Sequence, residues 1–267
     1  MPPVERSAAS PLLAHPLEAP SAFRPEDLMQ AVRDSRGLPD DPLPPICVLD
    51  FDGDLSDGLV GLPGVAPVRS WACFHTQMLG VTFGDVRCGV VPRTIGGPYA
   101  VLVAEQLHAA GVPVIVGLTS AGRVSPDLPL PCIVVADDAV RDEGTSLHYL
   151  PQSRLVDSPS PALADRLMRA LAPVSTVRRG RVWSTDAPYR ETSAQLAAWA
   201  AEEVLAVEMQ AASLFAFGQA RGATIGVVAL VSNGSDHDGA QFDTGEQAYR
   251  VRVLEAIASA GAAHLAP

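Results

Sequence analysis

The sequence predicts an α/β protein, a three-layer α/β/α sandwich around a central, mostly mixed β-sheet. From Ile46 onward, short apolar runs alternate with amphipathic segments, and Gly or Pro residues separate the two kinds. The 267 residues are 48% hydrophobic, enough to bury a sizeable core. Because strands that alternate with helices form sheets covered by those helices, the pattern favours helices on both faces of one sheet.

Residues 1–45 differ in composition from the rest of the chain. They hold ten of the 24 prolines and are rich in Ala and Ser, which is typical of an irregular arm. Within this arm we expect one short helix, around Pro25–Ser35. Residues 46–267 are predicted to form the folded domain.

The expected strands are apolar, often β-branched runs that end at polar or turn-forming residues. The first of them runs directly into a loop of Asp and Gly residues. In chain order they are Ile46–Asp50, Cys88–Pro92, Val112–Leu118, Cys132–Ala136, Arg181–Ser184, Val204–Glu208 and Thr224–Val231.

The expected helices show apolar residues at helical spacing, and three of them are followed by a glycine suited to a C-terminal cap. These glycines are Gly111, Gly222 and Gly261. In chain order the helices are Pro98–Ala110, Pro161–Leu171, Glu191–Ala200, Gln210–Arg221 and Glu246–Ala260.

Charge and cysteine content exclude several classes of protein. A formal net charge of −11 argues against a nucleic-acid-binding face. The apolar runs are too short to span a bilayer, and the N-terminus lacks the apolar stretch of a secretory signal. The four cysteines are scattered without a CxxC pair, which predicts reduced thiols in a cytoplasmic protein and no metal site.

Residues Val207 to Ala212 (VEMQAA) bring polar groups and a thioether to the junction of a strand and a helix. Around them, residues 184–233 read STDAPYRE, then VEMQAA, then VSN. In this order the segments resemble the nucleoside phosphorylase family, the purine nucleoside and uridine phosphorylases. The resemblance extends from Ile46 to Gly261 and implies the fold of that family, with residues 46–267 as its catalytic domain.

The resemblance implies a ribose site at Glu208, Met209 and Gln210. Cleavage of an N-glycosidic bond passes through an oxocarbenium-like state, so groups that grip the ribose hydroxyls as charge develops speed the reaction. Glu208 is retained, Met209 packs on the sugar, and Gln210 stands where the family has a second Glu, so we expect Gln210 to be catalytic without supplying negative charge. The alternative is that Glu208 caps the following helix and Met209 belongs to the core.

Two glycine-containing turns match the family in the expected order. Residues Ile95 to Tyr99 (IGGPY) resemble its Gly-Gly-Pro turn, and residues 117–123 (GLTSAGR) occupy the place of its phosphate loop. Ser120 matches the hydroxyl that binds phosphate, and Gly117 replaces the family's arginine. Arg93 and Arg123 are the nearby cations that we consider as substitutes.

The resemblance implies further residues that contact the nucleobase or reach the phosphate site of a neighbouring subunit. Tyr189, in the segment like TTDAxYRE, is expected to stack on the base. Asn233 replaces an Asp that protonates purines, and we expect it to be catalytic and to bind the base edge. The Gln and Arg pair with which uridine phosphorylases read uracil is not found near Tyr189, which favours a purine-like base. Asp236, His237 and Asp238 follow as candidate acids or as a solvated loop. His75 lies where the family sends an arginine into a neighbouring subunit, and His148 is interpreted as structural.

The loop after the first strand permits another interpretation. Asp50 and Asp52, after an apolar strand, resemble the nucleophile and acid/base of haloacid-dehalogenase-type phosphatases. That match covers ten residues only. In the phosphorylases the corresponding loop binds phosphate, and here Asp50, Asp52 and Asp54 crowd it.

The sequence thus predicts phosphorolysis of a nucleoside to free base and ribose 1-phosphate, with phosphate as co-substrate and no cofactor. The acidic loop and Gly117 keep two alternatives open: hydrolysis without phosphate, and a nucleoside-binding protein without activity. The resemblance implies a homo-oligomer, from dimer to hexamer, and we expect the protein in the cytoplasm.

Overall fold

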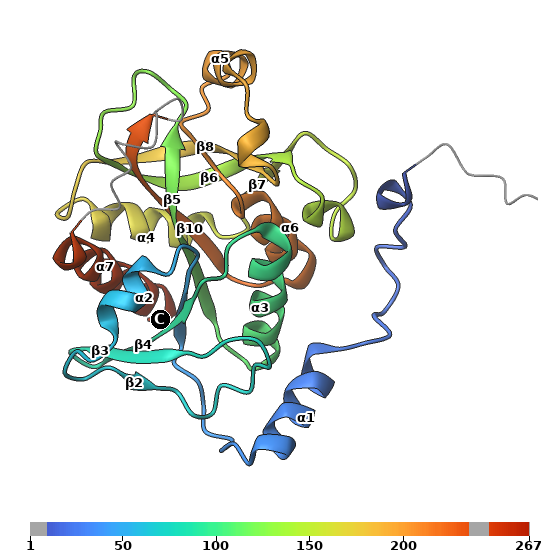
Figure 1. Ribbon diagram of the computed structural model, residues 1–267, viewed down its shortest axis with the longest axis vertical. Coiled ribbons are helices and arrows are strands. Elements are labelled where there is room, and N and C mark those ends of the chain that lie inside the picture. Colours follow the sequence, from blue (N-terminus) through green and yellow to red (C-terminus); the bar gives the residue numbers. More distant parts are fainter. Residues whose placement is uncertain (1–9, 235–245, 267) are drawn as a thin grey trace, which may run out of the picture.

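The computed structural model describes residues 10–234 and 246–266 of the chain. Within them a ten-stranded mixed sheet runs through the molecule, with helices on both of its faces (Figure 1). This confirms the predicted fold class. The strands are β1 Ile46–Asp50, β2 Ala66–Pro67, β3 Leu79–Phe83, β4 Val86–Pro92, β5 Val114–Arg123, β6 Cys132–Asp142, β7 Leu155–Asp157, β8 Val177–Thr185, β9 Ala206–Glu208 and β10 Ile225–Gly234.

The sheet combines a parallel group of strands with strands that pair in mixed directions. Strands β4, β1, β5 and β10 lie side by side and parallel, and β3 adds antiparallel to the edge at β4. On the other side, β10 pairs with β6, β6 with β8, β8 with β9 and β9 with β5. These pairings bring β9 and β10 against β5, so three chain segments meet at its end.

The helices divide into two layers over two apolar cores. Helices α3 and α6 contribute to one core and α4 and α7 to the other, with Leu214 and Leu254 as fully buried examples. The helices are α1 Pro25–Arg36, α2 Asp54–Leu59, α3 Gly97–Ala109, α4 Pro161–Leu171, α5 Ser193–Ala201, α6 Ala211–Arg221 and α7 Gln247–Leu265, with short 3-10 turns η1 Pro11–Leu13, η2 Thr145–His148 and η3 Pro188–Arg190.

The predicted elements form near their expected places, with instructive exceptions. The last helix was predicted to stop at Gly261, and this is wrong, because α7 continues to Leu265. A Cβ at Gly261 would lie 2.8 Å from Cγ1 of Ile46, so this glycine lets the helix approach β1. Strands β5 and β6 run on into polar residues, where pairing with β9 and β7 sustains them. Helix α2 and strand β3 were not predicted.

The N-terminal arm packs against the rest of the molecule, and two of its contacts involve α1 and His15. Helix α1 buries Met29 and Val32 in the same core as α3. Farther toward the N-terminus, the ring of His15 lies 4.0 Å from that of His148 in η2. His148 therefore packs against the arm, and burial lowers the pKa of its imidazole.

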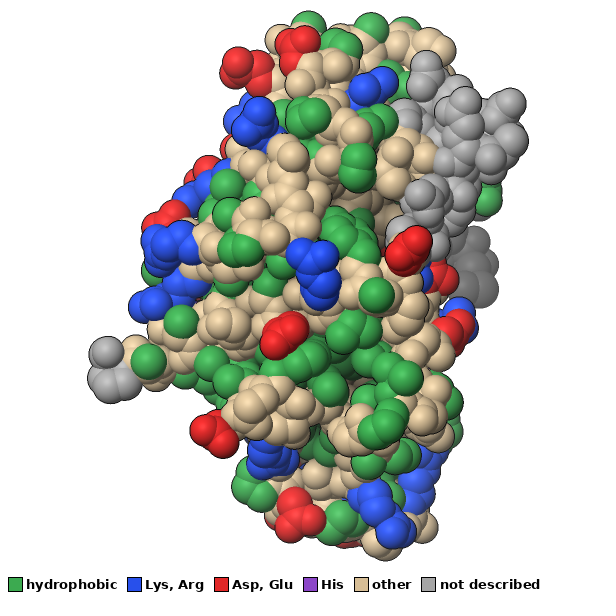
Figure 2. Space-filling model, turned by 90° about the vertical axis from the view of Figure 1, so that its left-hand side faces the viewer, with side chains coloured by type: hydrophobic (Ala, Val, Ile, Leu, Met, Phe, Trp, Pro, Cys, Tyr) green, Lys and Arg blue, Asp and Glu red, His purple; other side chains and the backbone are tan. Residues whose placement is uncertain are grey.

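The described part of the chain contains no helix that is both long and apolar enough to cross a membrane. On the described part of the face in Figure 2, acidic and basic side chains are interspersed among apolar ones. Among the described residues, no cluster of three or more His, Cys, Asp or Glu side chains is arranged to hold a metal ion.

Candidate active site

Strand β5 gathers three of the predicted site segments at its end. Gly122 pairs with Asn233 of β10 on one side and with Val207 of β9 on the other, while Leu118 pairs with Asp50 of β1. The last residues of β5 around Ser120, the segment from Glu208 to Gln210 and the end of β10 are therefore neighbours. Ser120 precedes Glu208 by 88 residues and Asn233 by 113, which is why no single motif defines the site.

Glu208 lies at the N-terminus of α6 and is 4% exposed. Its carboxylate accepts hydrogen bonds from the backbone N–H groups of Gln210 at 2.6 Å and Ala211 at 2.9 Å, and from the Ser184 hydroxyl. Ser184 Oγ in turn accepts from Ala212 N at 2.8 Å. Oε2 of Glu208 thus satisfies two free N–H groups of the first helical turn, and Oε1 accepts from the Ser184 hydroxyl, whose oxygen satisfies a third. Burial raises the pKa of Glu208 to about 7.

The two residues that follow are placed differently. Gln210 is 1% exposed, and its Oε1 accepts from Met209 N at 3.1 Å. Met209 itself is half-buried. The ribose-binding roles of Glu208, Met209 and Gln210 stay predictions, and the helix-capping alternative for Glu208 agrees with its observed hydrogen bonds.

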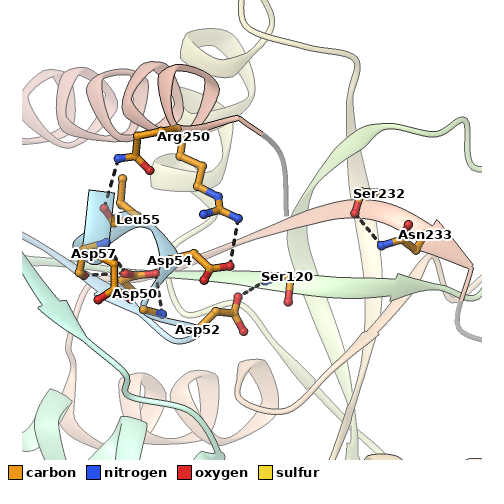
Figure 3. A network of polar contacts seen from close by, with 12 residues as sticks. Asp50, Asp52, Asp54, Leu55, Asp57, Ser120, Ser232, Asn233 and Arg250 are labelled. Carbon is orange, nitrogen blue, oxygen red and sulfur yellow. Dashed lines mark hydrogen bonds and ion pairs between the residues drawn. The ribbon is translucent and has the colours of Figure 1, made fainter. Parts of the chain in front are cut away.

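The loop after β1 turns its acids inward (Figure 3). Asp50 is buried and accepts from Ser56 N at 2.8 Å, Ser56 Oγ at 2.5 Å and Gly53 N at 3.3 Å. Asp52 reaches across to β5, where its Oδ2 accepts from Ser120 N at 2.7 Å. Burial raises the pKa of both carboxyl groups.

One glycine and two arginines determine how much positive charge lies near this loop. A Cβ at Gly117 would lie 2.6 Å from Cζ of Phe51, so the Phe51 ring fills the space in front of this glycine. Arg93 lies over Gly53, and its Nη2 contacts Asp57 at 2.5 Å. Arg250 of α7 pairs with Asp54 at 3.0 Å. Arg93 is thus close to the loop, as considered from the sequence, and is held by an acid there.

A cavity of about 260 Å³ opens beside Asp52 and Ser120. Of the residues predicted for the site, Ser120 is in its wall. Figure 3 shows Ser120 between Asp52 and the pair Ser232–Asn233. The lining combines acids, hydroxyls and leucines: Asp50, Asp52, Asp54, Leu55, Leu118, Thr119, Ser120, Pro131, Cys132, Leu230, Val231, Ser232, Glu246, Tyr249 and Arg250.

The remaining predicted residues are nearer the surface. Tyr189 in η3 is fully exposed, and His75 is exposed with its ring 6.5 Å from that of Tyr99. Asn233 is half-buried, and its Nδ2 donates to Ser232 Oγ at 3.0 Å. Their roles toward a base or a partner stay predictions. Asp236, His237 and Asp238 lie outside the described residues.

The structure places Asp52 against Ser120, adds Arg250 to the candidate site and argues against the phosphatase interpretation. Asp50, which would be the nucleophile, has both oxygens engaged by Ser56 and Gly53. The crowded acids were a visible signal in the sequence, but their contact with Ser120 joins residues 68 positions apart. Arg250 lies on a helix whose pattern gave no sign of a site.

Comparisons with known proteins agree with this architecture. The sequence profile of the phosphorylase superfamily matches residues 53–261. The chain is 29% identical over 155 residues to guanosine phosphorylase of Halorubrum lacusprofundi, covering 58% of this chain and 64% of that protein. It is 31% identical over 172 residues to uridine phosphorylase of Treponema pallidum, covering 57% and 64%. The chain thus spans just under two thirds of the length of these relatives.

A solved structure extends the likeness in fold. The crystal structure of uridine phosphorylase from Vibrio fischeri, complexed with 6-hydroxy-1-naphthoic acid, matches with a TM-score of 0.69 at 20% identity. The match covers 82% of this chain and 92% of that one.

Proposed function

The chain belongs to the phosphorylase superfamily, and on that basis we propose that it cleaves the N-glycosidic bond of a nucleoside and releases the free base. One observation supports the proposal: the end of β5, which contains Ser120, pairs with Asn233 of β10 and with Val207 of β9, directly before Glu208. These are the three segments that the resemblance assigns to the acceptor, the sugar and the base.

We propose the following roles. Gln210 and Met209 contact the ribose, and Glu208 holds the first turn of α6 beneath them. Asn233 binds the base edge through its amide, and Tyr189 covers the base when substrate is present. Since an amide donates a hydrogen bond but cannot deliver a proton, the base must be one that leaves without a strong acid, and a 6-oxopurine meets this condition.

The acceptor of the ribosyl group is the open part of the proposal. The relatives named guanosine phosphorylase and uridine phosphorylase support phosphate, with ribose 1-phosphate as the second product. Water is the other candidate, favoured by the contact between Asp52 and Ser120. With either acceptor, we propose that the protein is a homo-oligomer in the cytoplasm. In this assembly each subunit contributes His75 to the site of its neighbour.

Release of free base from a nucleoside panel tests the proposal. Guanosine, inosine, adenosine and uridine are incubated with the full chain, with and without phosphate, and the bases are separated by chromatography. Release of base from at least one of them is expected, fastest for guanosine or inosine. Ligand-induced thermal stabilisation without any base release would instead identify a nucleoside-binding protein and contradict the proposed activity.

A further inference from the structure

A carboxylate of the chain occupies the backbone donor where an acceptor anion is expected. Ser120 N lies at the end of β5, in the segment that resembles the phosphate loop, and it donates to Asp52 Oδ2 at 2.7 Å. One N–H group makes one strong hydrogen bond of this length. A phosphate oxygen therefore reaches this N–H only if Asp52 first leaves it.

The charge around Asp52 also opposes a phosphate dianion. Asp50 and Asp54 flank it in the wall of the same cavity, and like charges at such range repel strongly where water is partly excluded. Arg250 pairs with Asp54 and Arg93 with Asp57, so each of these cations already faces an acid. At Gly117 the Phe51 ring leaves no space for the arginine of the family.

We propose that Asp52 is a catalytic residue and that the ribosyl acceptor is water, which Asp52 activates as a general base. This inference rests on the proposed cleavage of a nucleoside. The water oxygen forms the new bond to C1′ while the bond from C1′ to the base nitrogen breaks, and its electron pair leaves with the base. One water hydrogen stays on the C1′ hydroxyl, and the other passes to Asp52 and then to solvent. The base takes up a proton from solvent, so the products are ribose and free base.

The surroundings of Asp52 suit this task. The cavity of about 260 Å³ has room for a water molecule beside Asp52, Ser120 and Ser232. The bond from Ser120 N fixes the Asp52 carboxylate in the wall of this cavity. Burial raises the pKa of Asp52, which makes its carboxylate a stronger base than an exposed one.

Asp52→Asn tests the inference, with Asp57→Asn as its matched control. The Asn amide oxygen still accepts from Ser120 N, but it takes up no proton, so we expect kcat for base release to fall about 100-fold or more. KM should change little. Asp57 is exposed and pairs with Arg93 outside the cavity, so its variant should keep wild-type kcat. Wild-type kcat should fall at acid pH as Asp52 protonates, and this limb should be missing in Asp52→Asn.

Phosphate dependence of the wild-type enzyme supplies a second test that needs no variant. Base release at the same rate with and without phosphate supports the inference. A requirement for phosphate overturns it while leaving the proposed function intact, and so does wild-type activity in a folded Asp52→Asn. Absence of base release from every nucleoside under both conditions overturns the proposed function and this inference with it.

Discussion

Glu208 and Asp52 are two carboxylates of one candidate site that differ in where their hydrogen-bond donors come from. Glu208 accepts from Gln210 and Ala211, its own neighbours in the chain, and is 4% exposed. Asp52 is half-buried at a cavity and accepts from Ser120, on another strand. The local bonds cap a helix, whereas the bond to Ser120 holds Asp52 in the wall of the cavity. A carboxylate in a family motif thus caps a helix, while one outside that motif lines the cavity.

The sharpest way to break this comparison is to delete Glu208. In Glu208→Ala, the hydroxyl of Ser184 and the N–H groups of Gln210 and Ala211 lose their acceptor inside the protein, so unfolding free energy should fall by about 3 kcal/mol or more. Asp52→Ala should cost about 1 kcal/mol, since water can reach Ser120 through the cavity. Urea denaturation measures both, and equal losses contradict the comparison.

The pH dependence of unfolding free energy sharpens the comparison between Glu208 and Asp52. The pKa of Glu208 is raised from 4.5 to about 7 in the folded protein, so between these values the folded state binds more protons than the unfolded state. Its contribution is therefore present below about 4.5 and lost as pH rises through about 7, a change of about 3 kcal/mol. The difference in unfolding free energy between wild type and Glu208→Gln should follow this trend. A difference that stays flat with pH means that Glu208 remains ionised.

On the acceptor side, the test is to restore the family's arginine. Gly117→Arg pushes a side chain into the Phe51 ring and should lower unfolding free energy by about 1–3 kcal/mol. It should not make base release depend on phosphate. Thr82→Arg, on the exposed side of β3, is the control and should stay within about 0.5 kcal/mol of wild type. A stable, phosphate-dependent Gly117→Arg enzyme means that the anion site is open.

The smallest effect on stability is expected at Tyr189, which is fully exposed, whereas both carboxylates are buried or half-buried. Because Tyr189 is fully exposed, Tyr189→Ala should change unfolding free energy by about 0.5 kcal/mol or less. If it stacks on the base as proposed, KM should rise about tenfold, since base stacking on an aromatic ring stabilises by about 1–3 kcal/mol. An unchanged KM removes Tyr189 from the site.

The sequence alone predicted the fold well because hydrophobic runs and caps act locally. Helix α4 spans the residues expected from its pattern, and α6 ends at the expected Gly222 in a left-handed conformation. Gly261 misled because a glycine that permits close packing looks the same in the sequence as one that ends a helix.

The site was predicted less completely because its decisive contacts are long-range. The motif containing Glu208 was visible, but its hydrogen bonds to the helix backbone were only one of two interpretations. In the sequence, the acids of the β1 loop crowd the place of the family's phosphate loop. That Asp52 ends at Ser120, and that Phe51 fills the space beside Gly117, depends on how β1 and β5 pair.

Identification of the sugar product tests the central claim most directly. The wild-type chain is supplied with guanosine in phosphate buffer, and the sugar released with guanine is analysed by mass spectrometry. The account predicts free ribose in amounts equal to guanine, because Asp52 delivers water to C1′. Ribose 1-phosphate as the main product would contradict it and show that phosphate displaces Asp52 from Ser120.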